Sequence, residues 1–156
     1  MTQFFIENGE MILRLVLAVV LGIIIGAERL FVHKEAGMKT HALVALGSAV
    51  FVVVSEIIAV KYVGSSSFDP SRIASQIVVG IGFLGAGSII FHENRLLGLT
   101  TAGGLWVTAG IGMAAGFGLF NLAVIATALV LVIFILVNIF EKPIKKISGD
   151  IDNPAA

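Results

Sequence analysis

Three ionisable side chains, Glu28, His41 and Glu56, lie within or at the edges of long apolar runs and are the first candidates for chemistry in this 156-residue chain. A carboxylate at membrane depth can bind and release a proton or cation, and an imidazole can relay a proton near neutral pH. These residues therefore indicate a polar path for a proton or cation. The alternative is a structural role, because pairing is the usual way to hold charges near a bilayer and ion-pair belts would close a helix bundle.

Other chemistries have weaker support in the sequence. The chain has no cysteine, which excludes disulfides and thiolate metal sites. The histidines lack metal-ligand spacing, and too few carboxylates converge to predict a divalent-cation cage. A dinucleotide-like pattern, Gly80-x-Gly82-x-x-Gly85, falls inside an apolar segment, whereas the true fingerprint follows a strand. We therefore expect neither an enzyme nor a cofactor, and a metal site stays undecided.

Composition assigns the chain to the membrane proteins. Hydrophobic residues make up 58% of it, charged residues 13%, and its mean hydropathy is +1.06. Soluble domains carry about 25% charged residues, so this chain has too little polar surface to coat a globule. The zero formal net charge gives no reason to expect a nucleic-acid partner. Glu7 and Glu10 stand where a signal peptide would be basic, so we expect the first apolar run to be a retained anchor.

Five apolar runs, each near the roughly 20 residues that cross a hydrocarbon core, divide the chain. The runs are 11–28, 41–60, 71–91, 99–118 and 120–140. They predict an all-α integral membrane protein, a bundle of about five transmembrane helices over residues 1–140, with a short basic cytoplasmic tail, disordered or on the membrane surface, over 141–156. Asp69 and Pro70 suit the start of the third helix, and Thr100 or Thr101 is the expected N-cap of the fourth.

Lysine and arginine predict the orientation of these helices. Seven of them fall on the side of the carboxyl terminus and three on the other side, which predicts the amino terminus outside and the carboxyl terminus in the cytoplasm. The seven are Arg29, Lys34, Lys39, Arg95, Lys142, Lys145 and Lys146, and the three are Arg14, Lys61 and Arg72.

This orientation sorts the polar residues into two layers, each with both signs of charge. The outer layer contains Arg14, Glu56, Asp69, Arg72 and Gln76, and the inner layer contains Glu28, Arg29, Lys39, His41, Thr100 and Thr101. Arg72 falls in the first turn of its helix, where the helix dipole disfavours a cation, so we expect a carboxylate partner for it. One helix face, which must contact protein or water, carries His41, Ala45, Ser48, Val52, Ser55 and Glu56.

Eleven of the 18 glycines lie between Ser71 and Phe120. Small residues let transmembrane helices approach backbone to backbone, so these glycines predict tight packing of a glycine-rich, interrupted third and fourth helix. The predicted packing positions are Gly80, Gly82, Gly85, Gly87, Gly103 and Gly104, with Gly22 and Gly26 on the first helix.

Four segments in order, residues 21–29, 37–47, 69–87 and 98–112, read LGIIIGAER, GMKTHALVALG, DPSRIASQIVVGIGFLGAG and GLTTAGGLWVTAGIG. Together they resemble the MgtC/SapB family of bacterial and archaeal inner-membrane proteins, over roughly residues 21–118. The resemblance implies a five-helix domain of the inner membrane. It also implies that the residues to test are Glu28, Thr40, His41, Asp69, Arg72, Gln76, Thr100, Thr101 and Trp106.

The function implied by the resemblance is that of a non-enzymatic modulator of membrane proteins, linked to magnesium homeostasis, low-magnesium growth and survival inside macrophages. Its implied partners are the lipid bilayer and other membrane proteins, with ATP synthase proposed for some members. The charged layers favour a different function, a small cation or proton transporter or channel built from one bundle or from a homodimer. Longer family members continue into a soluble carboxyl-terminal domain, so roles of that domain are not expected of these 156 residues.

Overall fold

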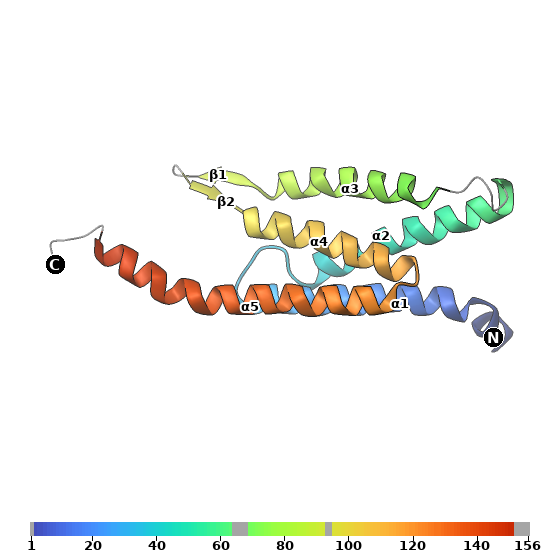
Figure 1. Cartoon of the computed structure of the whole chain (residues 1–156), viewed down its shortest axis with the longest axis horizontal. Helices are drawn as coiled ribbons and strands as arrows, with labels where there is room; N and C mark the ends of the chain where they lie inside the picture. The colour runs from blue at the N-terminus through green and yellow to red at the C-terminus, as the bar shows by residue number, and fades with distance from the viewer. Residues whose placement is uncertain (1, 64–68, 93–94, 152–156) are drawn as a thin grey trace.

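The computed structural model describes residues 2–63, 69–92 and 95–151, and this part of the chain contains five α-helices. A short π-helix extends the second helix, and a two-stranded hairpin joins the third to the fourth. In chain order the elements are α1 (Thr2–Phe31), α2 (Met38–Ile58), η1 (Ala59–Val63), α3 (Pro70–Gly87), β1 (Ile90–His92), β2 (Arg95–Leu97), α4 (Leu99–Gly116) and α5 (Phe120–Ile151). The helices run in alternating directions, so α1 begins and α5 ends at opposite ends of the bundle (Figure 1).

Three of the helices are long and apolar enough to cross a membrane. Their spanning stretches are Asn8–Phe31, Met38–Lys61 and Phe120–Phe140. The other two helices have 18 residues each, or about 27 Å at 1.5 Å per residue, slightly less than a hydrocarbon core of about 30 Å. The prediction of five helices in a membrane protein is therefore confirmed, and length and composition support a full span for three of them.

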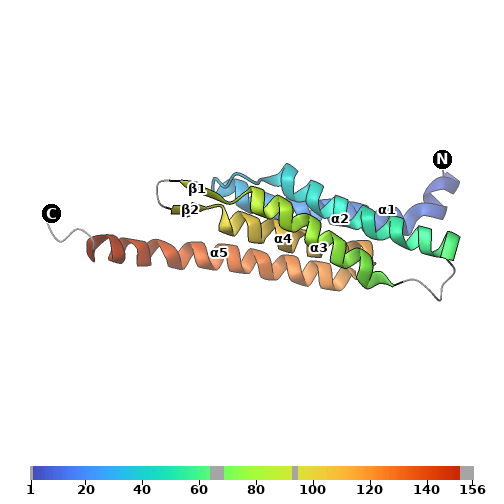
Figure 2. The same cartoon turned by 90° about the horizontal axis from the view of Figure 1, so that it is seen from above.

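The core lies where α1, α2 and α4 meet, with α5 packed against α1 and α4. The edge of the bundle is formed by α3 in Figure 1, and Figure 2 shows α3 in front of α4, which it contacts. On α1, a Cβ added to Gly22 would lie 2.7 Å from the carbonyl oxygen of His41, and one added to Gly26 would lie 2.5 Å from the Cα of Met38. On α4, a Cβ at Gly112 would overlap the backbone of Ala45. Glycine is therefore required where the backbones of α1 and α4 touch the backbone of α2.

The glycines of α3 behave differently from those of α1. Gly80, Gly82 and Gly87, like Gly103 on α4, have no atom within 4 Å of an added Cβ. A Cβ added to Gly85 of α3 would lie 3.7 Å from Ala102, and one added to Gly104 of α4 would lie 3.3 Å from Phe134. The closest backbone packing thus involves α1, α2 and α4, and α3 and α4 are unbroken helices, contrary to the expected interrupted pair.

The start of α3 agrees with the prediction, and the start of α4 does not. The Asp69 side chain accepts a hydrogen bond from the Ser71 amide at 2.9 Å, and Pro70 occupies the first turn. The N-cap of α4 is Gly98, not Thr100 or Thr101. Gly98 has a φ of +88° and lies against the carbonyl of Ser88, where any side chain would clash. The backbone conformation, and not a hydroxyl cap, decides where α4 begins.

Two boundaries differ from the sequence expectation. The third helix was expected to reach residue 91, but α3 ends at Gly87, and Ile90–His92 pairs antiparallel with Arg95–Leu97. The expected tail over 141–156 is helical as far as Ile151, because α5 continues past Pro143; residues 152–156 lie outside the described part. Extending an existing helix needs no new nucleus, which favours the continuation, although Pro143 itself has no N–H to donate. A tight turn joins α4 to α5, with Gly118 at a φ of +73°.

Candidate functional site

Arg14 of α1 forms a polar cluster at the end of the bundle where α1 begins. Its guanidinium donates to Glu56 of α2 and to Glu10 of α1, both at 2.6 Å, and to the carbonyl oxygen of Gly116 at the end of α4, at 3.0 Å. The two carboxylates remain partly open to solvent. We call these four residues the Arg14 cluster. It joins three helices through one cation.

A second cluster surrounds Arg29, in the last turn of α1, where the helix dipole favours a cation. The Arg29 side chain is almost fully buried and is paired with the carboxylate of Glu28. Its guanidinium carbon lies 3.5 Å from the centre of the Phe134 ring of α5, a cation–π contact. Asn138, one turn further along α5, donates to Glu28 at 3.3 Å. This arginine thus contacts a single carboxylate and an aromatic ring, and the Asn138 amide holds the carboxylate.

His41 of α2 completes the second group, and we call Glu28, Arg29, His41, Phe134 and Asn138 the Arg29 cluster. The imidazole is fully buried, and its Nδ1 donates to the carbonyl oxygen of Gly37 at 3.1 Å. A donating Nδ1 leaves Nε2 as an acceptor in the neutral ring. Among the described residues Nε2 has no hydrogen-bond partner. This nitrogen is the one ring atom of the cluster available for another proton or ligand.

The structure gathers the inner-layer candidates only in part. Glu28, Arg29 and His41 come together, and Thr101 is buried on α4. Lys39 and Thr40, at the start of α2, and Thr100, at the start of α4, are exposed. Sequence reasoning missed Phe134 and Asn138, although an amide inside the apolar run 120–140 is itself a signal, because polar side chains at membrane depth usually have partners.

The α3 candidates stay separate from the Arg14 cluster. Asp69, Arg72 and Gln76 are exposed, and among the described residues Arg72 forms no ion pair, so the expected carboxylate partner is absent there. The hydroxyl and the amide of Ser71 donate to Asp69 and hold the pKa of its carboxyl below the ordinary value. Trp106, also exposed, lines a shallow apolar cavity between α3, α4 and α5.

The Arg14 and Arg29 clusters are thus internal ion pairs, as the ion-pair-belt interpretation predicts, whereas Lys39, Asp69 and Arg72 are exposed. Within the described ranges, no three residues among His, Asp and Glu gather into a metal-binding group. The unpartnered Nε2 of His41, next to a carboxylate and an arginine, is the feature that the belt interpretation does not use. The Arg29 cluster is therefore the better candidate for a functional site.

Comparison with known proteins places this arrangement in a family. The MgtC family model matches residues 15–143. The protein described as "Putative magnesium transporter YhiD" of Escherichia coli K12 is 44% identical over 135 residues, which cover 81% of this chain and 61% of the relative. Protein MgtC of Salmonella typhimurium LT2 is 48% identical over 120 residues, which cover 77% of this chain and 49% of the relative.

The chain thus spans about half to three fifths of the length of these curated relatives. No solved structure matches it. The matched region contains the whole Arg29 cluster and starts one residue after Arg14. By this match over most of its length, and by its identity to these relatives, the chain belongs to the MgtC family.

Proposed function

We propose that this chain is a multi-pass protein of the cell's inner membrane that supports magnesium homeostasis by modulating another membrane protein, without catalysing a reaction. The family supports this proposal, as do the names of two relatives, one of which refers to magnesium transport. The relatives are longer than this chain, so the proposal concerns the membrane domain alone.

Five crossings, with the carboxyl terminus in the cytoplasm, are part of this proposal. The α1–α2 connection and the β1–β2 hairpin lie at the end of the bundle toward which α5 runs (Figure 1). Arg29, Lys34, Lys39 and Arg95 lie in or next to these segments, whereas Arg14, Lys61 and Arg72 belong to the opposite end. The positive-inside rule favours the cytoplasm for the more basic end.

The observation that carries the modulator function is the outer surface of α3. Val79 and Phe83 are among the most exposed apolar side chains of the described residues, and Gly82 between them has no atom within 4 Å of an added Cβ. Small residues at such a surface let a helix of another protein approach closely. The chain does not use this surface itself, so it is available to a membrane partner.

Growth at low magnesium tests this function, in a host that lacks its own family member. We expect this chain to restore growth and Gly82→Leu to abolish the rescue, because the added side chain blocks the approach of a partner helix. Ala128→Leu, on the exposed side of α5, is the matched control and should keep the rescue. Rescue by Gly82→Leu at the level of the unchanged chain would contradict a partner on α3.

The partner to test first is the proton-translocating ATP synthase, which the family resemblance suggests. The two proteins are reconstituted together in vesicles, and ATP-driven proton uptake is followed with a pH-sensitive dye. We expect slower uptake with this chain present and normal uptake with Gly82→Leu. Equal uptake in vesicles with and without the chain would exclude this partner.

The second candidate function, a small proton or cation transporter, rests on the buried Nε2 of His41 beside Glu28 and Arg29. Vesicles that contain the chain alone, under gradients of magnesium, protons or potassium, separate the two functions. The modulator predicts no flux above that of empty vesicles. Flux that disappears in Glu28→Gln and persists in the matched Glu56→Gln would favour the transporter.

A further inference from the structure

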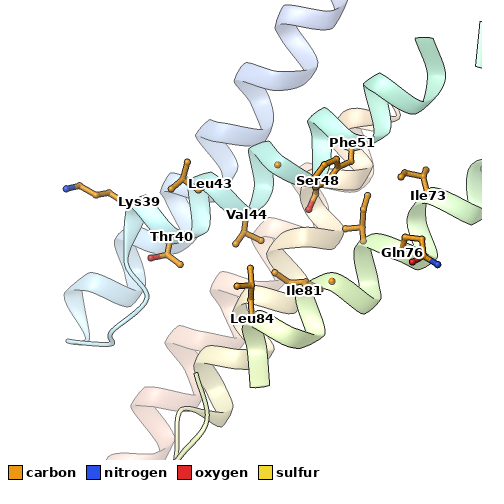
Figure 3. A pocket seen from close by; sticks show the side chains of 13 residues that line it. Lys39, Thr40, Leu43, Val44, Ser48, Phe51, Ile73, Gln76, Ile81 and Leu84 are labelled. Carbon is orange, nitrogen blue, oxygen red and sulfur yellow. The ribbon is translucent and has the colours of Figure 1, made fainter. Parts of the chain in front are cut away.

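A groove of about 730 Å³ runs between α2 and α3. Leu43, Val44 and Phe51 line it from α2, and Ile77, Ile81 and Leu84 line it from α3. Figure 3 shows Val44 and Leu84 facing each other across the groove. Leu43, Phe51 and Leu84 are all exposed, so the groove opens to the surroundings of the bundle. In a bilayer these surroundings are lipid.

The length of the groove suits a single acyl chain. From Lys39 to Phe51 it follows twelve residue steps of α2, or about 18 Å at 1.5 Å per residue, close to one leaflet of a core about 30 Å thick. It begins at the second residue of the Met38–Lys61 span, and therefore at a membrane boundary. A helix of another protein would cross both leaflets, whereas this groove matches one. Its volume also lies within the range of about 300–1,000 Å³ that is usual for small-ligand sites.

Charge at the boundary end complements an anionic headgroup. Lys39 and Thr40 lie at this end, both exposed, and in the described part of the chain neither side chain has an ion-pair or hydrogen-bond partner. In Figure 3 the Lys39 amine points away from the apolar side chains. Basic pockets between transmembrane helices on the cytoplasmic side are known to bind lipid headgroups.

We propose that the α2–α3 groove binds an anionic phospholipid, with one acyl chain between the two helices and the phosphate on Lys39 and Thr40. The lipid comes from the leaflet at the α1–α2 connection. Its chain fills the space between α2 and α3, so the lipid acts as packing material between these two helices. This site is independent of the partner surface around Gly82, because Gly82 does not line the groove.

Photolabelling of the full chain tests the site, in vesicles of phosphatidylcholine that contain a trace of phosphatidylglycerol with a diazirine in its acyl chain. Labelled peptides are mapped by mass spectrometry, and phosphatidylcholine with the same diazirine is the comparison probe. We expect labels on α2 and α3 along the groove. The anionic probe should label about five times more than the zwitterionic one, the factor expected for one lysine at the membrane surface.

Two variants test the acyl-chain groove and the headgroup contact separately. Gly80→Leu fills the groove, and the fold should persist because Gly80 has open space at its Cβ position and leucine favours helix over glycine. This change should abolish groove labelling by both probes. Lys39→Gln should remove only the preference for the anionic probe. The matched controls, Gly82→Leu and Lys34→Gln, should leave both results unchanged.

Three results would overturn the proposal. They are equal groove labelling by the two probes in the unchanged chain, labels spread evenly over the exposed side of α5, and groove labelling that survives Gly80→Leu. Growth at low magnesium is scored in parallel, because a chain that loses groove labelling and still rescues growth separates the lipid site from the proposed modulator function.

Discussion

Arg14 and Arg29 lie on the same helix, yet their surroundings differ. Two carboxylates, 71% and 43% exposed, and one carbonyl oxygen surround Arg14, whose own side chain is 16% exposed. The Arg29 side chain is 2% exposed and pairs with a single carboxylate, under an aromatic ring. Exposed ion pairs contribute about 0–1 kcal/mol, whereas removal of one partner from a buried pair costs about 3–5 kcal/mol.

This comparison shows how one residue type acquires two roles. Water can replace a lost partner in the Arg14 cluster, so that cluster mainly connects the ends of α1, α2 and α4. In the Arg29 cluster protein groups replace water, and His41 retains a ring nitrogen that has no hydrogen-bond partner in the described part of the chain. Because protein groups take the place of water in this cluster, any change in its charge must be compensated by neighbouring side chains. A switch or a proton-binding site requires such coupling.

The largest predicted effect tests this difference directly. Arg29→Leu should lower the free energy of unfolding by about 3–5 kcal/mol, because it leaves the Glu28 carboxylate without its cation. Arg14→Leu should lower it by about 1 kcal/mol, because Glu10 and Glu56 can hydrate. Reversible unfolding in mixed detergent micelles measures both values. Equal losses for the two variants would remove the distinction between the clusters.

A double replacement should partly reverse the larger loss. Glu28→Gln added to Arg29→Leu should recover roughly 2 kcal/mol, because a neutral amide is less costly to bury than an unpaired carboxylate. Glu56→Gln added to Arg14→Leu should change the free energy of unfolding by less than about 0.5 kcal/mol. The same unfolding assay, applied to the single and double variants of each pair, measures both coupling energies. No recovery in the Arg29 pair would mean that Glu28 is hydrated in the folded protein.

Removal of the aromatic ring over Arg29 should have an intermediate effect. Phe134→Leu keeps an apolar side chain but loses the cation–π contact, with an expected cost of about 1–2 kcal/mol. Phe140→Leu on the exposed part of α5 is the matched control and should cost little. Thermal unfolding of purified protein in detergent compares the two variants. A larger loss for Phe140→Leu would show that the ring contact is unimportant.

The smallest effect concerns the exposed start of α3, where Ser71 lowers the pKa of Asp69. A carboxyl with a lowered pKa in the folded state stabilises at pH above its ordinary value, here 3.8, and this contribution is lost as the pH falls through the lowered pKa. We therefore expect protection of the Ser71 amide against hydrogen exchange to decrease below that pH. Asp69→Ala should show weak protection at every pH. Equal pH profiles of Ser71 amide protection in the unchanged chain and in Asp69→Ala would contradict the role of Asp69 as the N-cap of α3.

The sequence by itself determined the elements and the positions of charge. Apolar runs of about 20 residues predict five helices because an apolar chain in lipid must satisfy its own backbone. Asp69 and Pro70 marked the start of α3 because both act on the adjacent backbone. The six-residue face of the second helix followed from helical periodicity. Its members His41, Ala45, Ser48 and Val52 are buried, whereas Ser55 and Glu56 are half-buried. Each of these features depends on residues that are close together in the chain.

Only the tertiary structure decided which helices meet and how each is rotated. Glycine content drew attention to α3, yet Gly80 and Gly82 face open space and Gly112 packs against Ala45. Periodicity defines a helix face but not the neighbour of that face. It therefore could not assign Glu56 to Arg14, nor show that Arg72 has no ion pair among the described residues. Phe134 and Asn138 joined Glu28 and Arg29 for the same reason, because α5 returns beside α1 across more than one hundred residues.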